Sequence, residues 1–428
     1  MEPPDSDRID CSRRALLGGV AGLAAAGAAP VAAAAPTLTV LTRNCYTGVD
    51  LAGLFDADSM DDVARIAGEM LDAVRSHPYE ARADALAAEV EATAPDAVAL
   101  QEAALIRVQS ESDFADAPVP NAEREVVDLL DLLTDRLAAR GLDYEVAAST
   151  VTTDIEVPAD RPDGRADVRL TDRTAVLVRS DADVSGTYAD TFDATYEYAF
   201  DGVDVPIRRG FCLVDLAVDG ADVTVAGAHL ASTADDVRRE QAGELLDLLP
   251  DDRPVALAGD LNSGPGGPRT AYDRLIESFE DAHASVRGDD ADGTCCHASD
   301  LRNDSADLSR RIDHVLVRGA LEPTEAARVG VDPGSRASAE VDGETVEVWP
   351  SDHAGVVATV AVTAGTPTST PTESPTATPT ATRTDAASGS GSGSGFWVFE
   401  RLPFLDGLVG VGSFALAAVA LYRRDGRP

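Results

Sequence analysis

The stretch VALAGDLNS at residues 255–263 shows the pattern that decides the fold. Its first four residues, 255–258, form an apolar run typical of a short buried strand, and the run stops at Gly259. Asp260 and Asn262 follow, and an extended backbone sends side chains two residues apart in the same direction. Because a sheet holds strand ends in place, we expect both polar side chains to belong to a functional site.

The same arrangement recurs along the chain, with polar side chains standing where an apolar run begins or ends. These positions are Asn44 after strand 38–43, Gln101-Glu102 after strand 97–100, His229 after strand 223–228, Asp313 in strand 312–317, and Asp352 and His353 before strand 355–362. The chain has only six histidines, and two of them fall in this set. The polar residues are therefore candidates for one site.

These residue types suit phosphate chemistry. Glu102, Asp352 and Asn44 offer hard oxygen ligands, which favour Mg²⁺ or Mn²⁺ over zinc. Mg²⁺ keeps several waters and is often completed by a substrate phosphate. The acidic and amide side chains thus predict a divalent metal centre that binds a phosphate ester.

The remaining members have roles in hydrolysis. Of Asp260 and Asn262, one would orient a water and the other would hold a phosphate oxygen. Asp313 can accept a proton from one nitrogen of His353, which fixes its tautomer and raises its basicity. His229 can donate to a phosphate oxygen. The set as a whole is suited to in-line attack of water on a phosphate ester.

Helices and strands alternate through the core. Helical spacing of apolar residues covers 60–76, 82–93, 123–139, 233–249 and 268–279, and the predicted strands also include 175–179 and 211–217. Strands 211–217 and 223–228 are separated by Asp219-Gly220, which predicts an antiparallel hairpin. The sequence therefore predicts an α/β fold with mixed sheets.

Six motifs, taken in order, resemble those of the endonuclease/exonuclease/phosphatase superfamily, which includes DNase I-like nucleases, AP endonucleases, inositol polyphosphate phosphatases and bacterial sphingomyelinases. They are Asn44, Gln101-Glu102, His229-Leu230, Gly259-Asp260-Leu261-Asn262-Ser263, Arg311-Ile312-Asp313-His314 and Ser351-Asp352-His353. The resemblance covers residues 37–362. It implies a four-layered sandwich of two packed mixed β-sheets flanked by helices, in a domain at 36–364.

The resemblance also implies roles for the site residues. Glu102 would bind the metal with help from Asn44 and Asp352, Asn262 would position the phosphate, and His229 would stabilise it in the transition state. Either His353, paired with Asp313, or Asp260 would be the general base. The substrate stays open between nucleic acid and phospholipid, and a stalked surface-binding module is the non-enzymatic alternative.

Composition indicates a protein of very salty surroundings. The chain has 428 residues, a net charge of −40, 52 Asp, 23 Glu and no Lys. Its 44% of apolar residues exclude global disorder, and five Cys exclude a small disulfide-stapled scaffold. At molar salt the Debye length is ~3 Å, so the acidic surface does not exclude nucleic acid as a substrate.

The two ends of the chain read as targeting segments. Ser12-Arg13-Arg14 before an Ala/Gly/Leu run predicts a twin-arginine signal peptide at 1–35. We expect a Thr/Pro/Ser- and Gly/Ser-rich stalk and linker at 365–401, a transmembrane anchor or cleaved sorting segment at 402–422, and a cytoplasmic tail at 423–428. The enzyme would then be a monomer anchored to the outer face of the cell membrane.

Weaker signals concern arginines and cysteines. Arg173 and Arg209 could contact a substrate phosphate or form salt bridges, and His314 is expected to face away from the site. Adjacent thiols chelate poorly, so Cys295-Cys296 does not predict zinc. In an exported protein a disulfide is plausible, for example from Cys45 to the 295–296 loop.

Overall fold

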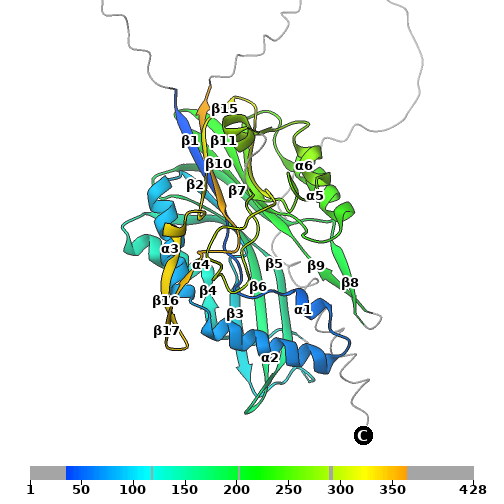
Figure 1. The fold of residues 1–428 in the computed structure, drawn as a ribbon. Coiled ribbons are helices and arrows are strands. Elements are labelled where there is room, and N and C mark those ends of the chain that lie inside the picture. Colours follow the sequence, from blue (N-terminus) through cyan, green and yellow to red (C-terminus); the bar gives the residue numbers. More distant parts are fainter. Residues whose placement is uncertain (1–34, 117–118, 201–202, 289–292, 364–428) are drawn as a thin grey trace, which may run out of the picture. The chain divides into compact units, whose positions relative to one another are not determined.

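The computed structural model describes residues 35–116, 119–200, 203–288 and 293–363 (Figure 1). The predicted signal peptide (except Ala35), stalk, linker and C-terminal segment lie outside the described residues. Among the described residues, no helix has the length and apolarity needed to cross a bilayer.

Two mixed sheets form the centre of the domain. The larger has the strand order β15-β18-β1-β2-β6-β3-β4, with β5 paired to β6, and the smaller has the order β13-β14-β12-β11-β10-β7. The larger sheet has β1 (Thr37–Asn44), β2 (Ala97–Gln101), β3 (Leu105–Ser110), β4 (Arg124–Asp128), β5 (Tyr144–Arg161), β6 (Gly164–Arg179), β15 (Leu321–Val329) and β18 (Gly355–Val362). The smaller sheet has β7 (Asp183–Thr191), β10 (Gly210–Val218), β11 (Ala221–His229), β12 (Val255–Asp260), β13 (Glu280–Asp281) and β14 (Asp313–Arg318).

Helices cover the outer face of each sheet, as Figure 1 shows for α3 and α4 on one side and α5 and α6 on the other. The helices are α1 (Ala52–Phe55), α2 (Met60–Ser76), α3 (Tyr79–Thr93), α4 (Leu129–Ala139), α5 (Asp235–Leu248), α6 (Thr270–Leu275) and α7 (Ala282–Arg287), with a 3₁₀ turn at Pro333–Ser335. Two small hairpins complete the fold, β8 (Tyr196–Phe200) with β9 (Val203–Ile207) and β16 (Ala337–Val341) with β17 (Glu344–Val348).

The alternation of side chains in the strands explains the layers. In β2, Ala97 and Ala99 face the other sheet and pack in the core between the sheets, while Val98 and Leu100 face α3 and α4. Both faces of the strand are thus buried, which is why its sequence reads as a continuous apolar run. The prediction of two packed mixed sheets flanked by helices is confirmed.

Some predicted elements are corrected. Residues 123–139 do not form one helix, because 124–128 pair with β3 as β4 and the helix α4 begins only at Leu129. Asp128 caps α4 by accepting hydrogen bonds from the N–H groups of Leu130 and Asp131. The helix expected at 268–279 is the shorter α6, and the sequence reading missed the long strand β5. The hairpin across Asp219-Gly220 is confirmed as β10–β11.

Candidate active site

Strand register brings the predicted site residues to the same ends of the two sheets. In the larger sheet, β1 and β2 run parallel, with Asn44 opposite Gln101 and Glu102 next in the chain. In the smaller sheet, His229 lies opposite Asp260, and Asp260 lies opposite Asp313. The polar strand ends predicted from the sequence are therefore neighbours within each sheet.

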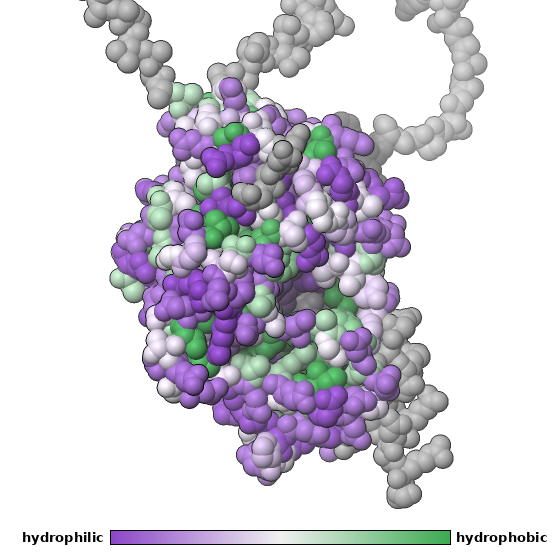
Figure 2. Space-filling model, in the orientation of Figure 1, coloured by the Kyte–Doolittle hydropathy of each residue, from purple (hydrophilic) through white to green (hydrophobic). Residues whose placement is uncertain are grey.

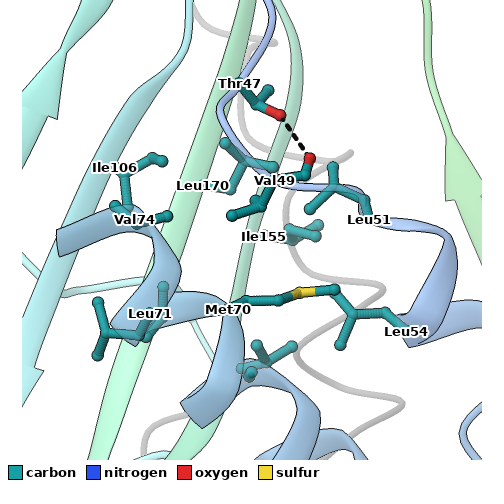
Figure 3. A pocket seen from close by; sticks show the side chains of 13 residues that line it. Thr47, Val49, Leu51, Leu54, Met70, Leu71, Val74, Ile106, Ile155 and Leu170 are labelled. Carbon is teal, nitrogen blue, oxygen red and sulfur yellow. Dashed lines mark hydrogen bonds between the residues drawn. The ribbon is translucent and has the colours of Figure 1, made fainter. Parts of the chain in front are cut away.

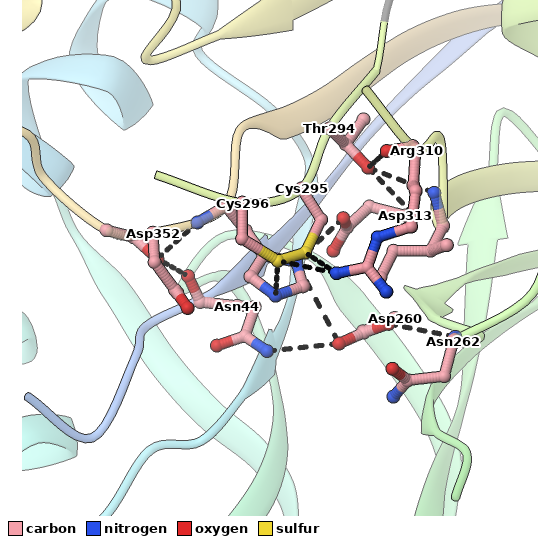
Figure 4. Close-up of a disulfide and its surroundings, with 12 residues drawn as sticks. Asn44, Asp260, Asn262, Thr294, Cys295, Cys296, Arg310, Asp313 and Asp352 are labelled. Carbon is pink, nitrogen blue, oxygen red and sulfur yellow. Dashed lines mark hydrogen bonds and ion pairs between the residues drawn. A yellow bond between two sulfur atoms is a disulfide. The ribbon is translucent and has the colours of Figure 1, made fainter. Parts of the chain in front are cut away.

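Asn44 joins the two groups. Its side-chain Nδ2 donates to Glu102 Oε1 and to Asp260 Oδ2, each at 3.1 Å, so one amide bridges carboxylates from different sheets. Figure 4 shows the contact with Asp260. Its Oδ1 accepts a hydrogen bond from the N–H of Tyr46 at 2.9 Å, which fixes the orientation of the amide. Asn44 is fully buried. It thus sets the distance between Glu102 and Asp260.

His353 and Asp313 form a buried pair. His353 Nδ1 lies 2.9 Å from Asp313 Oδ2 and 3.9 Å from Asp260 Oδ2. Burial alone would lower the pKa of His353, but the charges of Asp313, Asp352 and Asp260 outweigh it and hold the pKa well above 6.5. Because Nδ1 is taken by Asp313, Nε2 is the ring atom left for substrate.

Asp260 lies at the centre of the site. Its Oδ1 accepts from the N–H of Asn262 at 2.9 Å, and its Oδ2 lies 3.5 Å from His229 Nε2. Burial, followed by the charge of Asp313, raises the pKa of Asp260 to about 6. Burial and the neighbouring Arg209 hold the pKa of His229 well below 6.5. Asp260 is therefore a stronger base than an exposed aspartate, beside a neutral imidazole.

Glu102 and Asp352 provide the other carboxylates. Glu102 has a φ of +53° and accepts a hydrogen bond from the N–H of Thr47 at 3.1 Å. Burial and the charges of Asp352 and Asp172 raise the pKa of Glu102 to about 7, and burial also raises the pKa of Asp352. Glu102 and Asp352 are half-buried carboxylates that offer oxygen donors, and the charge of Asp352 disfavours that of Glu102, which fits a hard divalent cation.

The two predicted arginines differ. Arg209 joins the cluster, with Nη1 at 3.4 Å from both Asp172 Oδ2 and His229 Nδ1. Arg173 does not, because its Nε donates to Ala103 O at 2.7 Å and its Nη2 donates to Asp128. Consecutive residues of β6 point to opposite faces, so Asp172 and Arg173 diverge. Arg173 thus braces β2 and α4.

Asp172 is a residue whose place in the site the sequence reading did not assign. Its side chain is buried, and its Oδ2 accepts from Thr152 Oγ1 at 2.8 Å and from Arg209. It lies inside the long strand β6, where no strand end marks it. The alternation of β6, which turns Asp172 inward when Arg173 faces outward, is the one signal that could have found it.

Asn262 and His314 also have defined partners. Asn262 has a φ of +47°, and its Nδ2 donates to Leu230 O at 3.0 Å, so the amide stays beside Asp260. His314 lies on the opposite face of β14, where Nε2 is 3.0 Å from Ser263 O and the ring packs on Tyr272. His314 is therefore structural, as expected from its position next to Asp313.

A disulfide borders the site. Cys295 and Cys296 are joined to each other, and Cys296 Sγ lies 3.9 Å from His353 Nε2 (Figure 4). Arg310 Nη2 lies 3.1 Å and 3.2 Å from the two sulfurs. The expected bond from Cys45 to this loop is wrong, because Cys45 is a free thiol buried beside Leu41 and Leu100 in the core under α3.

An apolar cavity of ≈50 Å³ lies beside the site (Figure 3). Thr47, which donates to Glu102, is at its edge, and Val49, Leu54, Met70 and Ile155 line it. Figure 2 shows a hollow with hydrophobic side chains around it in a largely hydrophilic surface. The catalytic cluster therefore has an apolar neighbour.

Several solved structures are similar to this one. An endonuclease/exonuclease/phosphatase from Beutenbergia cavernae is 23% identical, with a TM-score of 0.47 over 76% of this chain and 72% of that chain. A mannosyl-6-phosphatase from Bacteroides thetaiotaomicron is 16% identical, with a TM-score of 0.47 over 76% and 99%. A family protein from Leptotrichia buccalis is 14% identical, with a TM-score of 0.46 over 76% and 99%.

A search of curated proteins found no match to the chain. The model of the Endonuclease/Exonuclease/phosphatase family, in contrast, matches residues 67–353, which is more than half of the chain and includes the cluster from Glu102 to His353. The match and the converging strand ends agree on one assignment: the protein belongs to the endonuclease/exonuclease/phosphatase family and is a hydrolase of phosphate-ester bonds.

Proposed function

We propose that the protein is a divalent-metal-dependent phosphoesterase that hydrolyses its substrate by in-line attack of water. The observation that carries this proposal is the double hydrogen bond from Asn44, which holds Glu102 of one sheet and Asp260 of the other on a single amide. The His353–Asp313 pair lies next to Asp260, with His353 Nδ1 3.9 Å from Asp260 Oδ2. A metal ligand, a base and a phosphate donor would thus act on one phosphorus atom.

Glu102 and Asp352 would hold Mg²⁺ or Mn²⁺, with Asn44 keeping Glu102 in place. The raised pKa values of both carboxylates support this, because burial and, for Glu102, the charge of Asp352 disfavour their ionised forms, and a bound cation would offset that cost. When bound, the metal would neutralise charge on the phosphate and polarise its oxygens.

The protein's own groups would do the proton chemistry. Asp260 would take the proton from the attacking water, since its carboxylate is held by the Asn262 N–H and by Asn44. His353, kept protonated by Asp313, would donate from Nε2 to a phosphate oxygen. Asn262 and His229, which also neighbour Asp260, would contact the remaining oxygens. These contacts would stabilise charge that develops in the transition state.

The test is hydrolysis of bis-p-nitrophenyl phosphate at high salt, with Mg²⁺, with Mn²⁺ and with EDTA. Glu102→Gln and His353→Ala should each abolish turnover while circular dichroism and thermal unfolding stay close to wild type. Glu145→Gln, an exposed residue of β5, is the matched control and should keep full activity. Full activity of either site variant would overturn the assignment.

For the substrate, one observation favours a phospholipid. The apolar cavity begins at Thr47, whose N–H donates to Glu102, so an apolar group could lie next to the reacting phosphate. Three arginines near the site, Arg209, Arg173 and Arg310, are engaged with Asp172, Asp128 and the sulfurs of the disulfide, so these three offer little free positive charge to a nucleic acid backbone. Plasmid DNA and phospholipid vesicles, tested in parallel, would separate the two classes.

We further propose that the enzyme is a secreted, archaeal-type and salt-adapted monomer held at the outer face of the membrane. The support is in the sequence: Ser12-Arg13-Arg14 near the start, 52 Asp without Lys, and an apolar segment at 402–422. Fractionation of cells that express the full chain tests export. Replacement of Arg13 and Arg14 by Ala should retain the protein inside, and unchanged export would contradict the proposal.

A further inference from the structure

A second group of carboxylates lies away from the active site, at the far end of the β5–β6 hairpin. Asp113 follows β3, Glu156 lies in β5 and Asp167 lies in β6, and one ligand oxygen from each lies within 4.8 Å of the other two. Asp167 is five residues along β6 from Asp172, or roughly 16 Å. The group is therefore separate from the catalytic cluster.

Two of these carboxylates are buried, and none of the three is paired with an opposite charge among the described residues. Glu156 is 2% exposed and Asp167 is fully buried, yet none of the three forms an ion pair with a described residue. Arg169 lies opposite Glu156 and its charge acts on that carboxylate, but its Nε and Nη2 are taken by Asp154 at 2.8 Å and 2.6 Å. Burial raises the pKa values of Glu156 and Asp167. Burying such carboxylates costs free energy unless a positive charge neutralises them.

Two oxygens in the group have no donor. Glu156 Oε2 accepts from the N–H groups of Asn121 and Ala122 at 2.9 Å and 2.7 Å, but Glu156 Oε1 is buried without a partner among the described residues. The same holds for Asn121 Oδ1, although Asn121 Nδ2 lies 3.1 Å from Asp113 Oδ2. A carboxylate and an amide carbonyl thus leave lone pairs free in an interior that normally satisfies them.

The surrounding backbone holds the ligand atoms in place. Asp167 Oδ2 accepts from the N–H of Asp113 at 2.9 Å, and Asp167 Oδ1 accepts from Ser112 Oγ. The β3–β4 loop is thereby fastened to the hairpin through the same carboxylates that lack a counter-charge. The arrangement is pre-organised, so a bound ion would need little rearrangement.

We propose that Asp113, Glu156 and Asp167, with Asn121 Oδ1, form a structural calcium site that ties the β3–β4 loop to the β5–β6 hairpin. All the donors are oxygens, which suits a hard cation. Two Ca–O bonds span about 4.6–5.2 Å, which accommodates oxygens within 4.8 Å of one another. Mg²⁺ fits less well, because it binds at shorter distances and retains waters that this buried position has little room for.

The test uses the full chain, stripped of metal and kept at high salt with saturating MgCl₂, so that the catalytic centre does not contribute. Calorimetric titration with CaCl₂ should give one binding event. Thermal unfolding should shift upward by about 5 °C at a hundredfold excess of free calcium over Kd. Absence of calcium binding by wild type would overturn the proposal.

The variants assign the binding to these residues. Glu156→Gln and Asp113→Asn should each weaken calcium binding about tenfold or more and reduce the thermal shift. Two controls, Glu123→Gln at an exposed position of the same loop and Glu102→Gln in the active site, should bind calcium and show the thermal shift as wild type does. Half-buried Asp113 is expected to tolerate substitution even if Glu156→Gln folds poorly.

A further readout separates an ion site from a hydrogen-bonded carboxyl cluster. In calcium-free buffer, Glu156→Gln should unfold at the wild-type temperature or above it, because it removes one buried charge from a group of like charges. A lower unfolding temperature in calcium-free buffer, or an undiminished calcium shift in Asp113→Asn, would show that the cluster is a structural network without an ion.

Discussion

Asp313→Asn is the most informative change, because it keeps the size of the side chain and removes the charge that faces His353. The two groups are hydrogen-bonded at 2.9 Å, and Asp313 is fully buried. Unit charges about 4 Å apart interact by about 4 kcal/mol at an effective dielectric of 20, which is about 3 pKa units. The pKa of His353 should fall by an amount of this order, while Asp352 and Asp260 still raise it.

The assay is the pH profile of kcat/KM for bis-p-nitrophenyl phosphate. If His353 acts as the protonated donor, turnover should fall about 100-fold or more, and the alkaline limb of the profile should move to lower pH. If His353 were the base, the acidic limb would move to lower pH instead. Exposed Asp222→Asn, on β11, is the matched control. A turnover and profile unchanged from wild type would refute the reasoning.

Three further predictions concern stability and metal dependence. Glu89→Ala should cost about 3–5 kcal/mol in urea unfolding, because it leaves the buried Arg43 guanidinium, 2.9 Å away, without its partner; an unchanged midpoint would contradict this. Burial alone would raise the pKa of Asp281, but hydrogen bonding to His314 holds it well below 3.8. Ionised Asp281 therefore stabilises the fold above pH ~4, and this stabilisation is lost as the pH falls. In Asp281→Asn the free energy of unfolding, measured from pH 5 downward, should lose this part of its acid dependence. EDTA should abolish turnover and Mn²⁺ or Mg²⁺ should restore it, except in Glu102→Gln; activity in EDTA would exclude the metal.

The central strands of the two sheets were predictable, because they are continuous apolar runs, whereas β3, β4, β5, β7 and β15 were not predicted. Residues 97–101 and 255–260 are fully buried on both faces, and such runs need no tertiary information to be seen. β5 was missed because its first half is largely exposed and mixes polar with apolar residues. β4 was read as part of a helix because Val126, Val127 and the leucines that follow also fit helical spacing. Pairing with β3 decides otherwise.

For the candidate site, the sequence predicted the members but not their contacts. Each polar residue stands next to an apolar run, so its position at a strand end follows from local pattern alone. Arg173 shows the limit of this reasoning, since its role as a brace depends on where Asp128 and Ala103 lie. Asp172 shows the converse, because a residue in the middle of a strand enters the site only through packing against Arg209.

Hydrophobic periodicity and side-chain chemistry are local properties of the chain, so the kinds of chemical group and their attachment to strands follow from the amino-acid order. Packing of distant segments decided that Asn44 bridges Glu102 and Asp260, and that Cys295 and Cys296 bond to each other while Cys45 stays in the core. It also decided that Glu156 keeps a buried oxygen with no partner in the part of the chain that the structure describes. These contacts join segments far apart in the chain, and their distances follow from how the sheets, loops and helices pack.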